Sequence, residues 1–400
     1  MKLGFVVLAA AALILSTVVE SLPFVEHNGN ATTWKILTRH VLSSAHSSQH
    51  CSFHKSPVQG VKQHIFKENY MKSEYVHHVD LFRCVAPEGK SNPEVFDPFL
   101  REEGYSCTNK ELPLEHCQYY CFWSCPIAPP ENRFPENAGH AINEGEYLFM
   151  VIHYENPSEL TDVKVESGVE FTFSHDDKEF DTAFLKVGRY ISYKNLIPPS
   201  SKNFVVPHTC TSECTEILPQ PIQIFGVTFH AHDSAMEIKL EHLRNGKSLN
   251  VIAHDKHYSP GEPFKFKKLE EQVKFLPGDE LRVDCTYDTS SAGGKAMIGG
   301  NSLESEMCIA FIEYYPRTMK LSACGTSTDG SAVKKFFGIE DFNSEDAINP
   351  IVSSPGYLNG KSFTEVVQSI EWNEENRAQF QELMKNGPKE KYCSVGHHFE

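Results

Sequence analysis

Residues 147–154 read YLFMVIHY, an unbroken apolar and aromatic run that is typical of a buried β-strand. Three further runs share this β-branched and aromatic character: VEFTFS at 169–174, QIFGVTFHAH at 223–232 and CIAFIEYY at 308–315. A helical period is found only near the C-terminus. We therefore predict an all-β protein built from two tandem antiparallel β-sandwich domains of the jelly-roll kind.

Turn and helix signals complete the expected architecture. The tripeptide Pro-Gly-Asp at 277–279 separates two strand-like runs and predicts a β-hairpin between residues 272–276 and 280–287. Near the end of the chain, Asn373 can cap a helix that runs to Gly387. We expect a short helical tail there.

A change in composition predicts where one domain ends. Residues 196–203, LIPPSSKN, have the proline and serine content of a connection between domains. The expected organisation is a signal peptide at 1–21, a leader at 22–48, an N-terminal domain at 49–195 and a C-terminal domain with the tail at 196–400.

Charge and targeting signals limit the partners. The net charge of the 400-residue chain is −16, which repels nucleic acid and anionic bilayers. Lys2 precedes an apolar run too short for a stable membrane span, which is typical of a secretory signal. We expect a secreted protein, extracellular or in the lumen of secretory vesicles, with Asn30 in its one glycosylation sequon. The twelve cysteines, an even number in an exported chain, are expected to form disulfides.

Two histidine patterns are candidate metal ligands. His230 and His232 are two apart on a strand-like run, which puts both rings on one face about 7 Å apart. His77 and His78 are adjacent, so both rings reach one metal only if the strand bulges. His153 ends another strand-like run. The alternative for each is a structural histidine with ordinary hydrogen bonds.

A methionine adds information about the metal. Imidazole alone suits zinc, copper, iron and nickel, whereas a thioether favours Cu(I). Met307 lies just before the run at 308–315. Taken alone, it is better explained as a packing residue.

Six separated motifs resemble the copper type II, ascorbate-dependent monooxygenases. They fit the dopamine β-hydroxylase and tyramine β-hydroxylase branch better than the peptidylglycine hydroxylase branch. In chain order the motifs are EYVHHVDLFRC (74–84), MVIHYENP (150–157), IPPSSKNFVVPHTCTSECTEILPQPIQIFGVTFHAH (197–232), RNGKSLNVIAHDKHYSP (244–260), LPGDELRVDCTYDT (276–289) and GGNSLESEMCIAFIEYYPR (299–317).

The resemblance implies two coppers per chain in a cleft between two β-sandwich domains, with ascorbate as the electron donor. It assigns His77, His78 and His153 to an electron-relay copper. It assigns His230, His232 and Met307 to the copper that binds oxygen, which makes these three the expected catalytic residues. The implied reaction inserts one oxygen atom of O₂ into a C–H bond of a small molecule.

The resemblance also implies five disulfides: Cys51–Cys107, Cys84–Cys117, Cys210–Cys324, Cys214–Cys393 and Cys285–Cys308. Cys121 and Cys125 remain unassigned. They are open to an extra local disulfide, two free thiols or a zinc site completed by a nearby histidine.

Departures from the family pattern leave the substrate open. Ala231 stands where the family prefers a hydroxyl residue, and Asp233 stands where an apolar residue is common. Peptide-hydroxylating relatives hold a carboxylate with Arg, Asn and Tyr, where this chain has Thr228, Ile309 and Phe311. Peptide hydroxylation is therefore the less favoured activity.

The sequence is consistent with two classes of function. The first is a secreted copper monooxygenase whose substrate is a small molecule, with a phenylethylamine as the candidate. The second is a non-catalytic copper-binding or extracellular matrix protein on the same scaffold. The sequence leaves the oligomeric state open.

Overall fold

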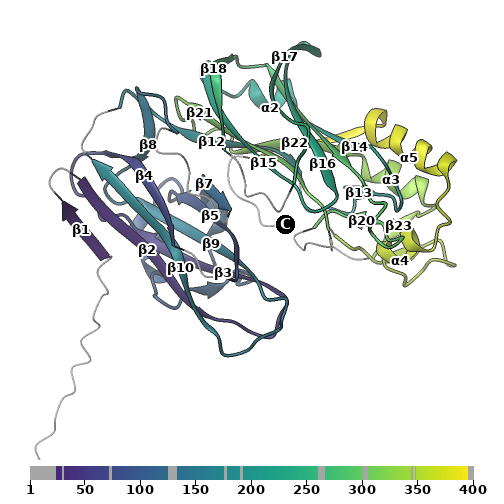
Figure 1. The fold of residues 1–400 in the computed structure, drawn as a ribbon, viewed down its shortest axis with the longest axis horizontal. Coiled ribbons are helices and arrows are strands. Elements are labelled where there is room, and N and C mark those ends of the chain that lie inside the picture. Colours follow the sequence, from purple (N-terminus) through teal and green to yellow (C-terminus); the bar gives the residue numbers. More distant parts are fainter. Residues whose placement is uncertain are drawn as a thin grey trace, which may run out of the picture.

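The computed structural model describes residues 24–28, 31–71, 74–124, 133–174, 178–189, 192–259, 266–300, 305–343, 346 and 348–394. Within these ranges the chain forms two β-sandwiches in succession, with the longest helix, α5, on the outer side of the second (Figure 1). The predicted signal peptide and Asn30 lie outside the described residues. The all-β, two-domain prediction is confirmed.

The first sandwich packs a six-stranded sheet against a five-stranded sheet. The six-stranded order is β1-β2-β10-β4-β8-β11, and the five-stranded order is β6-β3-β9-β5-β7. The strand bounds are β1 (Phe24–Asn28), β2 (Ala31–Val41), β3 (Ser47–Lys55), β4 (Gln63–Met71), β5 (Val76–Cys84), β6 (Tyr105–Ser106), β7 (Cys117–Ser124), β8 (Ala138–Ile142), β9 (Tyr147–Glu155), β10 (Lys164–Ser174) and β11 (Phe180–Asp181).

The second sandwich packs a six-stranded sheet, β18-β15-β21-β12-β22-β25, against a four-stranded sheet, β14-β19-β16-β17. Two short pairs, β13-β20 and β23-β24, lie beside them. The strand bounds are β12 (Ala183–Arg189), β13 (Leu196–Ile197), β14 (Phe204–Cys210), β15 (Ile222–His230), β16 (Ala235–Arg244), β17 (Lys247–Asp255), β18 (Lys267–Phe275), β19 (Glu280–Tyr287), β20 (Met297–Ile298), β21 (Cys308–Tyr315), β22 (Ala323–Thr328), β23 (Asp341–Phe342), β24 (Val352–Ser354) and β25 (Lys389–Ser394).

Short helices connect the strands, and one longer helix forms the predicted tail. The bounds are α1 (Asn92–Phe96), η1 (Asp97–Phe99), η2 (Leu114–His116), α2 (Ser212–Thr215), α3 (Gly330–Phe336), α4 (Phe363–Gln368) and α5 (Glu374–Asn386). The Asn373 side chain caps α5 by accepting from the backbone N–H of Asn376. Phe380 and Met384 are buried in the core of the second sandwich. Within the described residues, no helix is long and apolar enough to cross a membrane.

Sheet membership corrects two of the predicted domain limits. Residues 31–41, expected in a leader, form β2, where Trp34 and Ile36 are buried in the first core. Strand β12, expected in the first domain, pairs with β21 and β22 of the second sandwich. The change of sandwich therefore follows Asp181 and precedes the predicted limit at 195/196. The proline-rich stretch contains β13 and a loop within the second sandwich, so its composition does not mark a domain boundary.

The predicted hairpin around residues 277–279 is also wrong. The turn is present, since the backbone N–H of Asp279 donates to the carbonyl of Leu276 and Gly278 has a φ of 85°. However, β18 pairs with β15, whereas β19 pairs with β14 and β16 in the opposite sheet. Turn residues predict a change of direction but not which strands pair afterwards.

Five disulfides hold the sandwiches: Cys51–Cys107, Cys84–Cys117, Cys210–Cys324, Cys214–Cys393 and Cys285–Cys308. They are the pairs that the family resemblance implied. Cys125 and the side chain of Cys121 lie outside the described residues.

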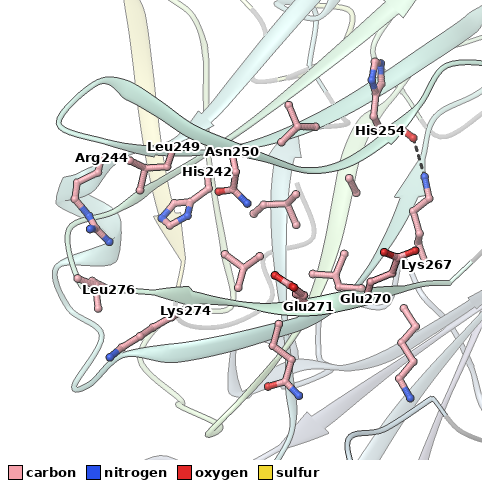
Figure 2. Close-up of a pocket in the computed structure, with 17 residues that line it drawn as sticks. His242, Arg244, Leu249, Asn250, His254, Lys267, Glu270, Glu271, Lys274 and Leu276 are labelled. Carbon is pink, nitrogen blue, oxygen red and sulfur yellow. Dashed lines mark hydrogen bonds between the residues drawn. The ribbon is translucent and has the colours of Figure 1, made fainter.

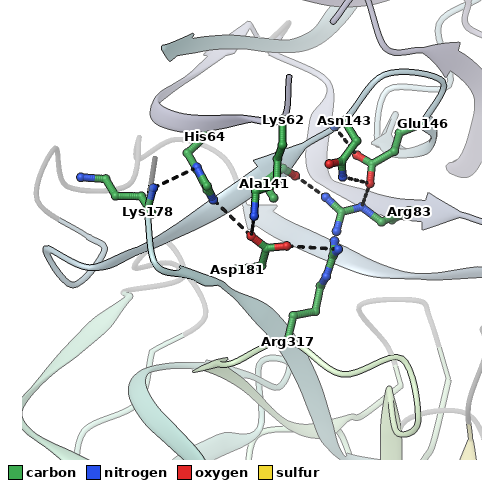
Figure 3. Close-up of polar contacts among 9 residues, drawn as sticks. All are labelled: Lys62, His64, Arg83, Ala141, Asn143, Glu146, Lys178, Asp181 and Arg317. Atoms are coloured by element: carbon green, nitrogen blue, oxygen red, sulfur yellow. Dashed lines mark hydrogen bonds and ion pairs between the residues drawn. The ribbon is translucent and has the colours of Figure 1, made fainter. Parts of the chain in front are cut away.

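Ionic contacts join the two sandwiches. Asp181 accepts from Lys62 at 2.7 Å and lies 3.2 Å from the Nε2 atom of His64, both in the first sandwich (Figure 3). Arg317 follows β21 of the second sandwich, and its guanidinium lies 3.3 Å from the same carboxylate. Burial alone would raise the pKa of Asp181, but the bonds from His64 and Lys62 lower it. The junction is therefore anchored by an ionised carboxylate.

Candidate metal centre

The first candidate ligand set lies on two neighbouring strands of the first sandwich. His77 and His78 belong to β5 and His153 to β9, with His78 opposite His153 in the strand register. The register shifts between Val76 and His78, so His77 is an extra, bulged residue. Such a bulge allows the rings of the adjacent residues His77 and His78 to reach one metal ion. One ligand atom from each of the three histidines lies within 4.8 Å of the others.

The Nδ1 atoms of this set face a common point. The Nδ1 atoms of His77 and His78 are 3.0 Å apart, about the separation expected for two nitrogens bound to one ion. The Nε2 atom of His153 lies 2.6 Å from the hydroxyl of Ser47, which leaves Nδ1 of His153 as the nitrogen available to a metal ion. That Nδ1 atom is buried and has no hydrogen-bond partner among the described residues. The set therefore fits a metal ion bound by three imidazoles.

The imidazoles of His77 and His78 are held in the neutral form that binds metal. Burial, followed by the neighbouring His78 and His153, lowers the pKa of His77 to about 3. The pKa of His78 is lowered well below its ordinary value, mainly by burial. Protons therefore compete weakly for these nitrogens at neutral pH.

The second candidate ligand set lies in the second sandwich. His230 ends β15, and Met307 directly precedes β21, the strand paired with β15. The sulfur of Met307 lies 3.1 Å from Nε2 of His230. The Nδ1 atom of His232 lies 2.8 Å from the carbonyl of Ser305, so it must carry the proton. This leaves the lone pair on Nε2 of His232 available for a metal.

A buried carboxylate fixes the backbone of this set. Glu306 is 0% exposed and accepts from the N–H groups of His232 at 3.0 Å and Met307 at 3.2 Å. Its other oxygen accepts from the N–H and hydroxyl groups of Ser234 at 2.8 and 2.6 Å. Burial raises the pKa of Glu306 to about 7 in spite of these bonds. Glu306 was not predicted from the sequence, although an acidic residue at the start of an apolar strand was the available signal.

Two tyrosines, also missed from the sequence, support the same backbone. The hydroxyl of Tyr258 accepts from the N–H of Ala231 at 2.9 Å and donates to its carbonyl at 2.8 Å. The hydroxyl of Tyr287 donates to the carbonyl of Met307 at 2.6 Å. Partners behind the ligands hold them in place in metal sites generally.

The two ligand sets meet at the boundary between the sandwiches. The ring centroids of His78 and His230 are 6.2 Å apart. The pKa of His230 is lowered well below its ordinary value, first by burial and then by His232 and His78. Met307, Ile309 and Phe311 pack into the core of the first sandwich. Two donor sets from different sandwiches therefore share one buried region.

A separate groove lies between β17 and β18, the outer strands of the two sheets of the second sandwich (Figure 2). Its volume is about 1050 Å³. None of the six candidate ligands lines it.

The donor chemistry of the two sets fits copper. Three imidazoles suit a copper ion that exchanges between Cu(II) and Cu(I), whereas two imidazoles and a thioether favour Cu(I). The unpartnered Nδ1 of His153 and the proximity of the Met307 sulfur to His230 are the observations behind this fit. Zinc is bound by Cys, His and carboxylate ligands, so a zinc site does not explain the thioether of the second set.

Comparison with known proteins gives relatives over most of the chain. It is 28% identical to human DBH-like monooxygenase protein 1 over 360 residues, which is 86% of this chain and 57% of that protein. It is 27% identical to human dopamine beta-hydroxylase over 388 residues, 94% of this chain and 59% of that protein. It is 29% identical to MOXD1 homolog 2 of Drosophila melanogaster over 332 residues, 80% of this chain and 42% of that protein. The chain thus spans less than two thirds of the length of these relatives.

Among solved structures, an insecticidal delta-endotoxin of Bacillus thuringiensis matches with a TM-score of 0.19 and 12% identity, over 71% of this chain and 53% of that one. A TM-score this low supports no conclusion about the fold or function of this chain.

Family descriptions match both sandwiches. Residues 34–161 match the N-terminal domain of the copper type II ascorbate-dependent monooxygenases, and residues 180–337 match the C-terminal domain. The second match begins beside β12, which agrees with the sheet membership of that strand. The chain belongs to the copper type II, ascorbate-dependent monooxygenase family, whose cofactor is copper and whose electron donor is ascorbate.

Proposed function

We propose that this protein is a secreted, copper-dependent monooxygenase that hydroxylates a C–H bond of a small molecule with O₂ and ascorbate. The observation that carries the proposal is the meeting of two chemically different donor sets, with the rings of His78 and His230 6.2 Å apart. The cysteines and the N-terminal apolar run support a secretory location.

We assign one role to each set. His77, His78 and His153 hold the copper that relays electrons, and His230, His232 and Met307 hold the copper that meets oxygen. When bound, copper supplies one-electron transfer at the first set and oxygen reduction at the second.

The protein contributes position and exclusion of water. Glu306 holds His232 and Met307 in a fixed relation through their backbone N–H groups. Ile309 and Phe311 bury the region between the sandwiches. A dry, fixed site limits release of reactive oxygen before the substrate is oxidised.

The substrate that we propose is a small amine of the phenylethylamine type. A cavity of about 1190 Å³ is lined by Asp233, Asp288 and Ser305, and the carbonyl of Ser305 accepts from Nδ1 of His232. Two carboxylates suit an ammonium group. A peptide carboxylate has less support, since Thr228, Ile309 and Phe311 offer it no cation.

The test is ascorbate-dependent oxygen uptake by the copper-loaded protein with a panel of phenylethylamines and glycine-extended peptides. We expect coupled uptake with amines, abolished in His230→Ala and retained in His254→Ala, a control histidine on β17 that is paired with Glu237. Absence of uptake with every amine would contradict the proposal.

The alternative is a non-catalytic, copper-binding or extracellular matrix protein. The substituted positions Ala231 and Asp233, which flank the ligands, favour it. Under this alternative, the protein binds copper but shows no turnover. The His230→Ala form then retains the biological effect of the protein.

A further inference from the structure

Two ligand histidines of the first set are each followed, two residues later, by a carboxylate. Asp80 follows His78 on β5, and Glu155 follows His153 on β9. Because the strand period is two, each carboxylate shares a face with its histidine.

The distances link each acid to the ring nitrogen that faces away from the metal position. An oxygen of Glu155 lies 3.1 Å from Nε2 of His153, beside the Ser47 hydroxyl that bonds the same nitrogen at 2.6 Å, and the Glu155 side chain is 15% exposed. An oxygen of Asp80 lies 3.5 Å from Nε2 of His78, and the Asp80 side chain is 12% exposed. Both carboxylates are therefore largely screened from solvent.

The second ligand set places a neutral partner behind the ring of His232. The Nδ1 atom of His232 meets the neutral carbonyl of Ser305, and Glu306 bonds to backbone N–H groups instead. The two sets therefore differ in charge behind the imidazoles as well as in their donor atoms.

We propose that Glu155, assisted by Asp80, lowers the reduction potential of the copper held by the three histidines. A carboxylate behind a ligating imidazole raises the basicity of the ligand. A more basic ligand and the nearby negative charge of Glu155 both favour Cu(II) over Cu(I). The first copper then gives up its electron more readily, being oxidised from Cu(I) to Cu(II) while the second site is reduced by one electron.

This inference rests on the proposed copper function and adds the residues that set the reduction potential of the first copper. Glu155 and Asp80 act through the histidines and are positioning and tuning residues. The carboxylates favour Cu(II) at the first site, and the thioether favours Cu(I) at the second site. The two effects therefore act in the same direction.

The test is a redox titration of the copper-loaded, full-length protein, followed by the Cu(II) electron paramagnetic resonance signal of the first site. At a fixed potential, Glu155→Gln is expected to raise the Cu(I):Cu(II) ratio about tenfold, equivalent to about 59 mV for one electron. Glu155→Asp, which keeps the charge, should stay closer to the wild type. Glu166→Gln, a surface acid paired with Arg39, is the matched control and should leave the ratio unchanged.

The outcomes separate the two proposals. Two bound coppers with an unchanged ratio in both Glu155→Gln and Asp80→Asn would overturn the tuning role alone. A wild-type protein that binds no copper would overturn the proposed function together with this inference. Copper content measured in each variant verifies that the first site is intact.

Discussion

Met307 distinguishes the second ligand set from the first at the scale of single residues. Its sulfur lies beside Nε2 of His230, and its backbone is held by Glu306 and Tyr287. The candidate ligands could be predicted because the ability of His and Met side chains to bind a metal does not depend on the fold. Glu306 was not, since only the folded chain brings His232 and Met307 onto one carboxylate.

Replacing the sulfur of Met307 tests its chemical role. Met307→Leu keeps a similar side-chain volume, so the fold should lose less than about 1.5 kcal/mol. Cu(I) affinity at the second site should fall at least tenfold, because the soft donor is gone. Competitive titration with a Cu(I) chelator measures this, and unchanged affinity would show that the sulfur only packs.

His50 gives a residue-scale prediction about pH. Burial, followed by the neighbouring His40, lowers its pKa to about 4 in the folded protein, against 6.5 when unfolded. Between those values only the unfolded state takes up the proton, so stability falls as pH falls from 6.5 to 4. His50→Gln should reduce this loss by about 2 kcal/mol at pH 4.5. Urea unfolding at pH 7 and pH 4.5 measures it, and equal losses in both proteins would refute the assignment.

Individual strands and helices show which parts of the fold can be predicted from the sequence. β9, β15 and β21 were predicted because their apolar runs carry the signal locally. The sheet that receives β12, and the separation of β18 from β19, depend on contacts with strands far away in the chain. Local propensity contains no information about such partners.

Helix α5 provides a test at the element scale. Phe380 is 0% exposed and packs against Phe204, Phe336 and Trp372. Phe380→Ala should reduce the free energy of unfolding by about 3–5 kcal/mol. Copper content should remain at the wild-type value, because the main packing partner of the helix is β14, which carries none of the six ligands. Chemical denaturation and metal analysis measure the two effects, and a loss of copper without a loss of stability would contradict this separation.

At the scale of the whole molecule, a buried ion network joins the two sandwiches. The guanidinium of Arg133 lies 2.5 Å from Glu313 of β21 and 2.7 Å from Glu68 of β4. Arg133 and both acids are buried. The network was invisible in the sequence because its members are separated by 65 and 180 positions.

Removing the cation of this network should weaken the contact between sandwiches. Arg133→Met should destabilise the protein by about 3–5 kcal/mol, because Glu313 and Glu68 lose their buried counter-ion. The double variant Arg133→Met, Glu313→Gln should recover part of that loss. Denaturation measures stability and small-angle X-ray scattering measures separation of the sandwiches. No destabilisation in Arg133→Met would show that the network is not holding them.

The most direct measurement is the copper content of the purified, copper-reconstituted protein beside His153→Ala and Met307→Ala. The account predicts about two coppers per chain in the wild type, with one lost in each variant and the other retained. A wild-type chain without copper would contradict the two-site account, as would two variants that affect the same single ion.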